Sequence, residues 1–237
     1  MKILAIDSSG LVASVALVTE DTVLAEYSTN FKKTHSQTLL PMVDEVMRMT
    51  GIEGDELDAI AVTNGPGSYT GLRIGSATAK GLGLAWNKPI VPVPTVDMLA
   101  ANFPGCDSLI CPIMDARRGQ VYSGLYHFRA EELEIVQKQS CTLLSDMIAR
   151  INEMGECVIF LGDGVPVHKE KLAQEVKVPF YFAPMHRLVQ NAASLGFLAV
   201  RLLKEGKSVP AMELVPEYLR LCQAEREREE RLEQKGE

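Results

Sequence analysis

The fold of this chain is decided near its start by the stretch Ile3-Leu4-Ala5-Ile6-Asp7-Ser8-Ser9-Gly10. An apolar, β-favouring run enters an aspartate and two serines, a pattern typical of a buried strand that ends in a polar turn. Residues 108–115 repeat this pattern, since a second apolar run ends in Asp115. Both runs open a series of elements of the same kind, so we predict an internal duplication.

Hydrophobic periodicity and turn residues give the expected elements of both halves. In the first half we expect strands at residues 2–7, 12–19, 22–27, 58–63 and 89–94, and helices at 36–50, 72–86 and 95–103. In the second half we expect strands at 108–114, 121–128, 134–141 and 157–161, and helices at 144–154, 166–175 and 189–205. The order predicts an α/β fold of two similar lobes, residues 1–104 and 105–222, with a cleft between them and a charged tail at 223–237.

Composition and charge narrow the function classes. The 237 residues are 46% hydrophobic and 23% charged, which is close to globular averages. Apolar runs stay far below the roughly 18 residues of a membrane span, and the start reaches Asp7 too soon for a signal core, so we expect no membrane association and a cytoplasmic protein. With a net charge of -7, the chain should bind RNA only through a partner. Five cysteines without a Cys-x-x-Cys pair argue against a disulfide framework and a zinc site.

The turn after the first strand offers the groups that a nucleotide phosphate requires. Asp7, Ser8 and Ser9 bring a carboxylate, two hydroxyls and backbone amides to one bend. Such amides can cradle an anion while the carboxylate positions a metal ion or water. Asp115 and the turn Gly162-Asp163-Gly164 are the facing candidates in the second half. The alternative is that aspartate and serine end these strands only because they favour turns.

The most distinctive segment is Asn64-Gly65-Pro66-Gly67-Ser68-Tyr69-Thr70-Gly71-Leu72-Arg73-Ile74-Gly75. Its glycines permit positive φ, and Ser68 or Thr70 can cap a helix whose N-terminus attracts anions. It lacks the lysine of a P-loop, so a purely structural turn is at least as consistent with it. No His-x-x-x-His pair and no Gly-x-Ser-x-Gly setting occur in the sequence, so we assign no metal ligand and no catalytic residue.

Two helices of the first half carry residues suited to a partner surface. The first has apolar groups beyond its core stripe, and the second is rich in small residues that permit close helix packing. The candidates for this surface are Leu40, Met42, Met49, Gly75, Ala77 and Gly81. The alternative is that these residues pack against the protein's own sheet.

Several motifs together resemble the bacterial TsaB family, also called YeaZ, over residues 3 to about 220. They are Ile6-Asp7-Ser8-Ser9, His35-Ser36, the glycine-rich segment from Gly65 to Gly75, Pro112 to Arg117 with Val121-Tyr122, Gly162-Asp163-Gly164, and Pro216-Glu217-Tyr218-Leu219-Arg220. The resemblance implies an actin-like ATPase fold (ASKHA, ribonuclease H-like) of two duplicated lobes with mixed sheets. It also implies a role in forming N6-threonylcarbamoyladenosine at position 37 of tRNAs that read ANN codons.

The resemblance further implies the partners. In that pathway the paralogue TsaD transfers the threonylcarbamoyl group, with TsaB and the ATPase TsaE as partners, and TsaB is the non-catalytic member. TsaD-like proteins carry a His-x-x-x-His metal pair, whereas His35 here is followed at the fourth position by Leu39. The resemblance therefore favours TsaB over TsaD.

The leading hypothesis is a non-catalytic scaffold or activator that forms a homodimer and binds TsaD. We expect this chain to require no cofactor, with ATP or ADP bound only at the level of the complex. A second hypothesis is an actin-like small-molecule kinase or ATPase that uses Asp7 and Asp115. A third is a glycoprotease-like, metal-independent peptidase.

Overall fold

The first half of the chain folds into one five-stranded mixed sheet. The structure, a computed structural model, describes residues 1–31, 33–129 and 132–219. The strands are β1 (Ile3–Asp7), β2 (Ala13–Val18), β3 (Val23–Thr29), β4 (Ala59–Gly65) and β5 (Ile90–Pro94), and the helices are α1 (His35–Thr50), α2 (Tyr69–Ala85) and α3 (Thr95–Ala100). The strand order is β3-β2-β1-β4-β5, with β1 antiparallel to β2 and parallel to β4.

The second half repeats this plan. Its elements are β6 (Leu109–Asp115), β7 (Gln120–Arg129), β8 (Glu132–Leu143), α4 (Leu144–Met154), β9 (Val158–Leu161), α5 (Gly164–Glu175), β10 (Phe180–Phe182) and α6 (Ala192–Lys204). The sheet order β10-β9-β6-β7-β8 is the order of the first sheet read from the other edge, and β6 is antiparallel to β7 and parallel to β9. The predicted α/β fold of two duplicated lobes with mixed sheets is confirmed.

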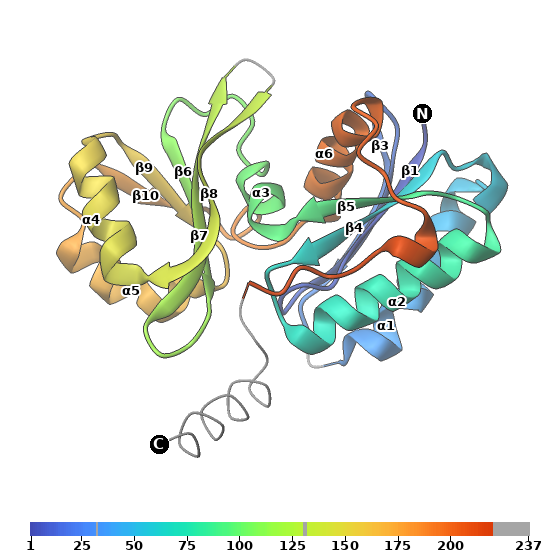
Figure 1. The fold of residues 1–237 in the computed structure, drawn as a ribbon, viewed down its shortest axis with the longest axis horizontal. Coiled ribbons are helices and arrows are strands. Elements are labelled where there is room, and N and C mark those ends of the chain that lie inside the picture. The colour runs from blue at the N-terminus through green and yellow to red at the C-terminus, as the bar shows by residue number, and fades with distance from the viewer. Residues whose placement is uncertain (32, 130–131, 220–237) are drawn as a thin grey trace, which may run out of the picture.

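Helices lie in three layers around the two sheets (Figure 1). Helices α1 and α2 cover the outer face of the first sheet, and α4 and α5 cover the outer face of the second. Helices α3 and α6 lie between the sheets, where residues of both lobes share one apolar core. None of the helices among the described residues is long and apolar enough to cross a bilayer.

The end of the chain returns to the first lobe, which corrects the predicted division. Helix α6 packs on β1 and β2 of the first sheet, although it follows the last strand of the second. Beyond it, Val209 pairs with Ile90 of β5, and the Glu217 amide donates to the carbonyl of Asn64 at 2.6 Å. The boundary between residues 104 and 105 therefore separates the two sheets, but assigning all of 105–222 to the second lobe is wrong. The predicted tail at 223–237 lies outside the described residues.

The orientation of α1 and α2 corrects two of the predicted partner residues. Met42 is buried in the core between α1 and the sheet. Gly75 is buried where α2 crosses β1. Both point toward the protein's own sheet, so neither is available to a partner in this fold. Leu40, Met49, Ala77 and Gly81 are exposed, as a partner surface requires.

Candidate functional site

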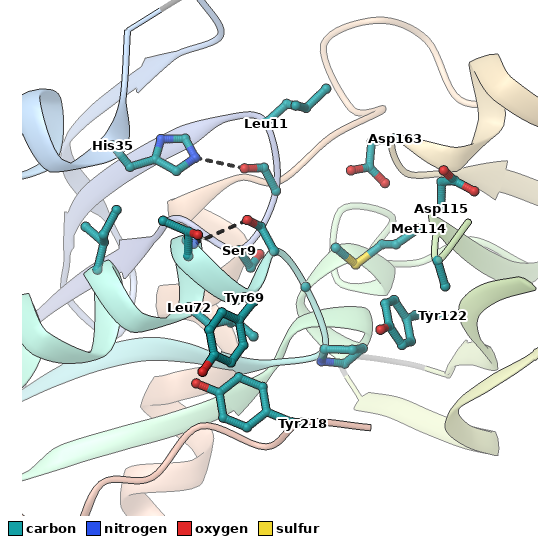
Figure 2. A pocket seen from close by; sticks show the side chains of 18 of the residues that line it. Ser9, Leu11, His35, Tyr69, Leu72, Met114, Asp115, Tyr122, Asp163 and Tyr218 are labelled. Carbon is teal, nitrogen blue, oxygen red and sulfur yellow. Dashed lines mark hydrogen bonds between the residues drawn. The ribbon is translucent and has the colours of Figure 1, made fainter. Parts of the chain in front are cut away.

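A cleft of about 1030 Å³ opens between the lobes. One wall is built by the turn after β1 and by the N-termini of α1 and α2, and the other by the ends of β6 and β9 (Figure 2). Tyr69, Tyr122 and Tyr218 line it with apolar neighbours such as Met114 and Leu72. This mixture of aromatic walls and a few polar groups is typical of a ligand-binding cleft.

Asp7 does not line this cleft. The residue is fully buried, and its Oδ1 accepts hydrogen bonds from Thr63 Oγ1 at 2.6 Å, Ser9 Oγ at 2.7 Å and the Ser9 amide at 3.2 Å. Burial raises the pKa of its carboxyl above the ordinary value, although these hydrogen bonds act in the opposite direction. Asp7 therefore fastens β1 to β4 and to its own turn.

The glycine-rich segment closes the turn that was a candidate phosphate cradle. The amide of Ser68 donates to the carbonyl of Ser9 at 2.7 Å, and Ser8 Oγ donates to the carbonyl of Gly71 at 2.9 Å. A Cβ on Gly71 would lie 2.1 Å from the Ser8 carbonyl oxygen. This approach is possible only for glycine, and it leaves the Ser8 and Ser9 side chains buried. Asp7 and Ser8 therefore do not line the cleft, whereas Ser9 does. A role of these three residues in holding a phosphate stays a prediction.

The second lobe does present carboxylates to the cleft (Figure 2). Asp115 Oδ1 accepts from the Arg117 amide at 3.1 Å and lies 3.2 Å from His168 Nε2. Burial raises the pKa of Asp163 to about 6, and the charges of Asp115 and Asp7 act in the same direction. Asp163 Oδ1 has no hydrogen-bond partner among the described residues. This group could exchange a proton with a ligand near neutral pH.

The glycines beside Asp163 are explained by packing. Gly162 has φ +100°, and a Cβ there would lie 2.2 Å from the carbonyl oxygen of Ile113. A Cβ on Gly164 would meet the side chain of Ile113 at 2.8 Å. These glycines let the turn pack against β6, and their role in cofactor binding stays a prediction.

Metal binding finds no support in the described part of the chain. Residues 1–31, 33–129 and 132–219 contain no group of three or more His, Cys, Asp or Glu side chains that could hold a metal ion.

Sequence reasoning missed an aromatic stack at the mouth of the cleft. Tyr69, in the first turn of α2, stacks on Tyr218 with ring centroids 5.2 Å apart (Figure 2), and the guanidinium of Arg73 lies 4.1 Å from the Tyr69 centroid. The spacing of Tyr69 and Arg73 on one helix face predicts their contact. Nothing local predicts Tyr218, because the chain returns to this place only after both lobes are complete.

Comparison with known proteins gives consistent matches over most of the chain. The model of the family described as TsaD, tRNA N6-adenosine threonylcarbamoyltransferase, matches residues 22–227. The chain is 39% identical over 225 residues to the tRNA threonylcarbamoyladenosine biosynthesis protein TsaB of Bacillus subtilis, covering 95% of this chain and 96% of that protein. It is 30% identical to the TsaB of Escherichia coli, with 93% and 95% covered.

Solved structures agree with these sequence matches. A crystal structure from Pseudomonas aeruginosa, described as similar to the peptidase YEAZ, superposes with a TM-score of 0.77 at 26% identity, covering 92% of this chain and 99% of that one. The actin-like fold that the resemblance implied is confirmed by this match and by the duplicated sheets.

Proposed function

The chain belongs to the TsaB family of tRNA threonylcarbamoyladenosine biosynthesis proteins, and from this premise we propose that it acts as a non-catalytic subunit. In this proposal it is a scaffold and activator for the formation of N6-threonylcarbamoyladenosine at position 37 of tRNAs that read ANN codons. The homologous TsaD performs the transfer, and TsaE is a further partner. ATP or ADP is needed only at the level of the complex, tRNA binds through the complex, and the site of action is the cytoplasm.

The contact of α2 with the start of the turn after β1 is the observation that carries this proposal. In an actin-like kinase or ATPase, that turn must remain open to the phosphates of the nucleotide. Here the N-terminus of α2 lies directly on it, with the Ser68 amide bonded to the Ser9 carbonyl and no room for a Cβ at Gly71. A phosphate could reach the Ser8 end of this turn only if α2 moved away from the sheet, although Ser9 and Gly10 line the cleft.

The exposed face of α1 and α2 supports a partner surface. We define it by Ala77, Gly81 and Leu84, which share one side of α2, and by Leu40 and Met49, which lie about 180° apart on opposite flanks of α1. Leu40 and Leu84 are each 55% exposed and Met49 is 67% exposed, while a Cβ on Gly81 would meet no atom within 4 Å. Small residues beside exposed apolar ones allow a second helix pair to approach closely. In the proposal this face binds TsaD and also a second copy of the chain, so the two associations compete.

Reconstitution tests the proposed function directly. Threonylcarbamoylation of tRNA by TsaD and TsaE is measured with and without this protein, and the isolated protein is assayed for ATP hydrolysis. We expect tRNA modification to require the protein and the protein alone to show no turnover. Modification that proceeds equally without it would contradict the scaffold role.

A kinase or ATPase remains the second candidate, because Asp115 and Asp163 face a cleft large enough for a nucleotide. Hydrolysis by the isolated protein that disappears in Asp115→Asn would favour this second function over the scaffold.

A substitution on α2 tests the partner face. Ala77→Arg puts a large side chain where close packing needs a small one, and overpacking of about 1–3 kcal/mol corresponds to roughly a ten- to hundredfold loss of affinity. We expect the variant to fold but to weaken both homodimerisation and TsaD binding, as measured by analytical ultracentrifugation. Ala173→Arg, on the exposed side of α5, is the matched control and should leave both unchanged. If folded Ala77→Arg and Gly81→Arg variants associate normally, the interface lies elsewhere.

A further inference from the structure

Two adjacent arginines adopt a backbone conformation that arginine normally avoids. Among the described residues, only Asn87, Arg117 and Arg118 combine a side chain with positive φ, at 52°, 63° and 56°. Asparagine tolerates this left-handed region, whereas a long side chain is disfavoured there. Asn87 is therefore unremarkable. Holding two arginines at positive φ costs conformational free energy that asparagine or glycine at these positions would avoid.

The hairpin between β6 and β7 does not itself require arginine. It is closed by hydrogen bonds of 3.0 Å from the Ala116 amide to the Gln120 carbonyl and from the Gln120 amide to the Arg117 carbonyl. Gly119 completes the tight turn with φ +74°. Asparagine followed by glycine is the preferred pair for such a turn. The sequence keeps arginine despite the strain, and strain of this kind concentrates at functional sites.

Both guanidinium groups are free of ion pairs within the described part of the chain. Arg117 and Arg118 are exposed, and neither forms a salt bridge there. By contrast, other arginines pair with a glutamate three or four positions away in sequence, as Arg48, Arg150 and Arg201 do. In a chain with a net charge of -7, two adjacent unpaired cations on a rigid turn are a local exception.

The cleft carries both signs of charge, since Asp115, Asp163 and Glu217 line it together with two cations. Arg117 lines the mouth on the second lobe, and Lys33 lines it on the first, also exposed and without a salt bridge among the described residues. Asp115 accepts the Arg117 amide and lies 3.2 Å from His168. Its carboxylate stabilises the turn, and it forms no salt bridge with either arginine among the described residues.

We propose that Arg117 and Arg118 bind the phosphodiester backbone of RNA when the chain is part of its complex. This inference rests on the proposed function, which supplies tRNA as the substrate. Arginine binds phosphate oxygens through two parallel hydrogen bonds, so a hydrogen-bonded turn that carries two exposed arginines suits consecutive phosphates. Two cations alone bind RNA weakly. Once the partner holds the RNA nearby, the same two contacts raise the affinity of the whole complex, because the RNA is already at a high effective concentration.

The position of the hairpin favours RNA over a protein partner. The turn lies at the end of the second sheet, on the other lobe from α1 and α2 (Figure 1), and so outside the proposed partner face. It can therefore contact RNA without competing with TsaD or a second copy of the chain.

The test neutralises the arginines without disturbing the turn. The double variant Arg117→Asn/Arg118→Asn tolerates positive φ, Arg117→Lys/Arg118→Lys keeps the charge, and Arg150→Gln/Lys171→Gln removes two cations from exposed positions on α4 and α5. The affinity of the reconstituted complex for tRNA is measured by filter binding from 50 to 300 mM salt. Assembly of each variant with TsaD is measured separately without RNA.

For the asparagine pair we expect about tenfold weaker tRNA binding at moderate salt and a salt slope lower by about two, one per phosphate contact. The α4/α5 control should stay within about twofold of wild type. The lysine pair, which keeps the charge but loses the bidentate hydrogen bonds, should keep the wild-type salt slope with an affinity between those of wild type and the asparagine pair. An asparagine pair that binds tRNA with wild-type affinity and slope would overturn the inference and leave the proposed function standing. Weakened assembly with TsaD would also overturn it, because the arginines would then contact protein. A wild-type chain that neither assembles nor supports modification would overturn both.

Discussion

Replacing Gly71 by alanine tests whether α2 seals the turn after β1. An added Cβ would lie 2.1 Å from the Ser8 carbonyl oxygen, whereas ordinary contact begins at 3.4 Å. The start of α2 or the turn must therefore move by about 1 Å or more, because neither atom is on a flexible side chain. That movement strains the bond from Ser8 Oγ to the Gly71 carbonyl and the bond from the Ser68 amide to the Ser9 carbonyl, now 2.9 and 2.7 Å long.

The expected loss of stability follows from these contacts. Overpacking costs about 1–3 kcal/mol, and each weakened buried hydrogen bond adds up to about 1 kcal/mol. Alanine returns up to about 1 kcal/mol through its better helix propensity. The net destabilisation is about 2–4 kcal/mol, which lowers the melting temperature of a chain of this size by roughly 4–16 °C.

Gly81→Ala is the matched control on the same helix. A Cβ at Gly81 meets nothing within 4 Å, so this variant should gain about 0.5–1 kcal/mol from helix propensity alone. Urea unfolding followed by circular dichroism gives both values, with the m-value checked for two-state behaviour. If Gly71→Ala is as stable as Gly81→Ala, α2 does not seal the turn, and the argument that a phosphate is excluded there fails.

Two further predictions concern buried carboxylates. Asp163 has a pKa of about 6 in the fold against about 3.9 when unfolded, so the native state binds its proton more tightly and stability falls as pH rises from about 4 to about 6. Asp163→Asn should therefore match the wild-type free energy of unfolding near pH 4 and exceed it by about 1–3 kcal/mol at pH 7.5, as measured by urea unfolding. Asp107→Asn is the control at an exposed position. If the difference between Asp163→Asn and wild type is the same at both pH values, Asp163 is not desolvated. Tyr126 donates from its hydroxyl to Asp97 Oδ1 at 2.6 Å across the shared core. Tyr126→Phe should cost about 1–3 kcal/mol in thermal or urea unfolding because the partly buried Asp97 loses its donor. Tyr181→Phe at an exposed position should cost almost nothing, and equal stabilities of the two variants would contradict this role.

Most elements could be predicted because their signals are local. The helix expected at residues 144–154 has those bounds in α4, and the first helix ends at Thr50 as expected. Strand β10 was missed, since its three residues are too few to show a period. The first helix begins at His35, one residue before the predicted start at residue 36.

The candidate site was predicted only in part. Its sequence motifs placed Asp7 and Asp115 at equivalent strand ends, and the structure confirms that equivalence. They do not say which end is covered, and only Asp115 faces the cleft. Likewise Gly75 and Ala77 are both small residues of α2, but two residues correspond to about 200° around a helix, so one faces the sheet and the other faces outward.

The sequence by itself determined the order of elements, the duplication, the family resemblance and the lack of a P-loop lysine. These properties are readable from short stretches of sequence, because the spacing of apolar side chains in helices and strands repeats every few residues. Tertiary structure alone decided that Asp7 is sealed, that α6 returns to the first lobe and that Asp163 holds its proton more tightly. Each of these depends on groups far apart in the chain, as Ser8 and Gly71 are, 63 positions from one another. Burial and electrostatics act through space, so they are established only when such distant segments meet.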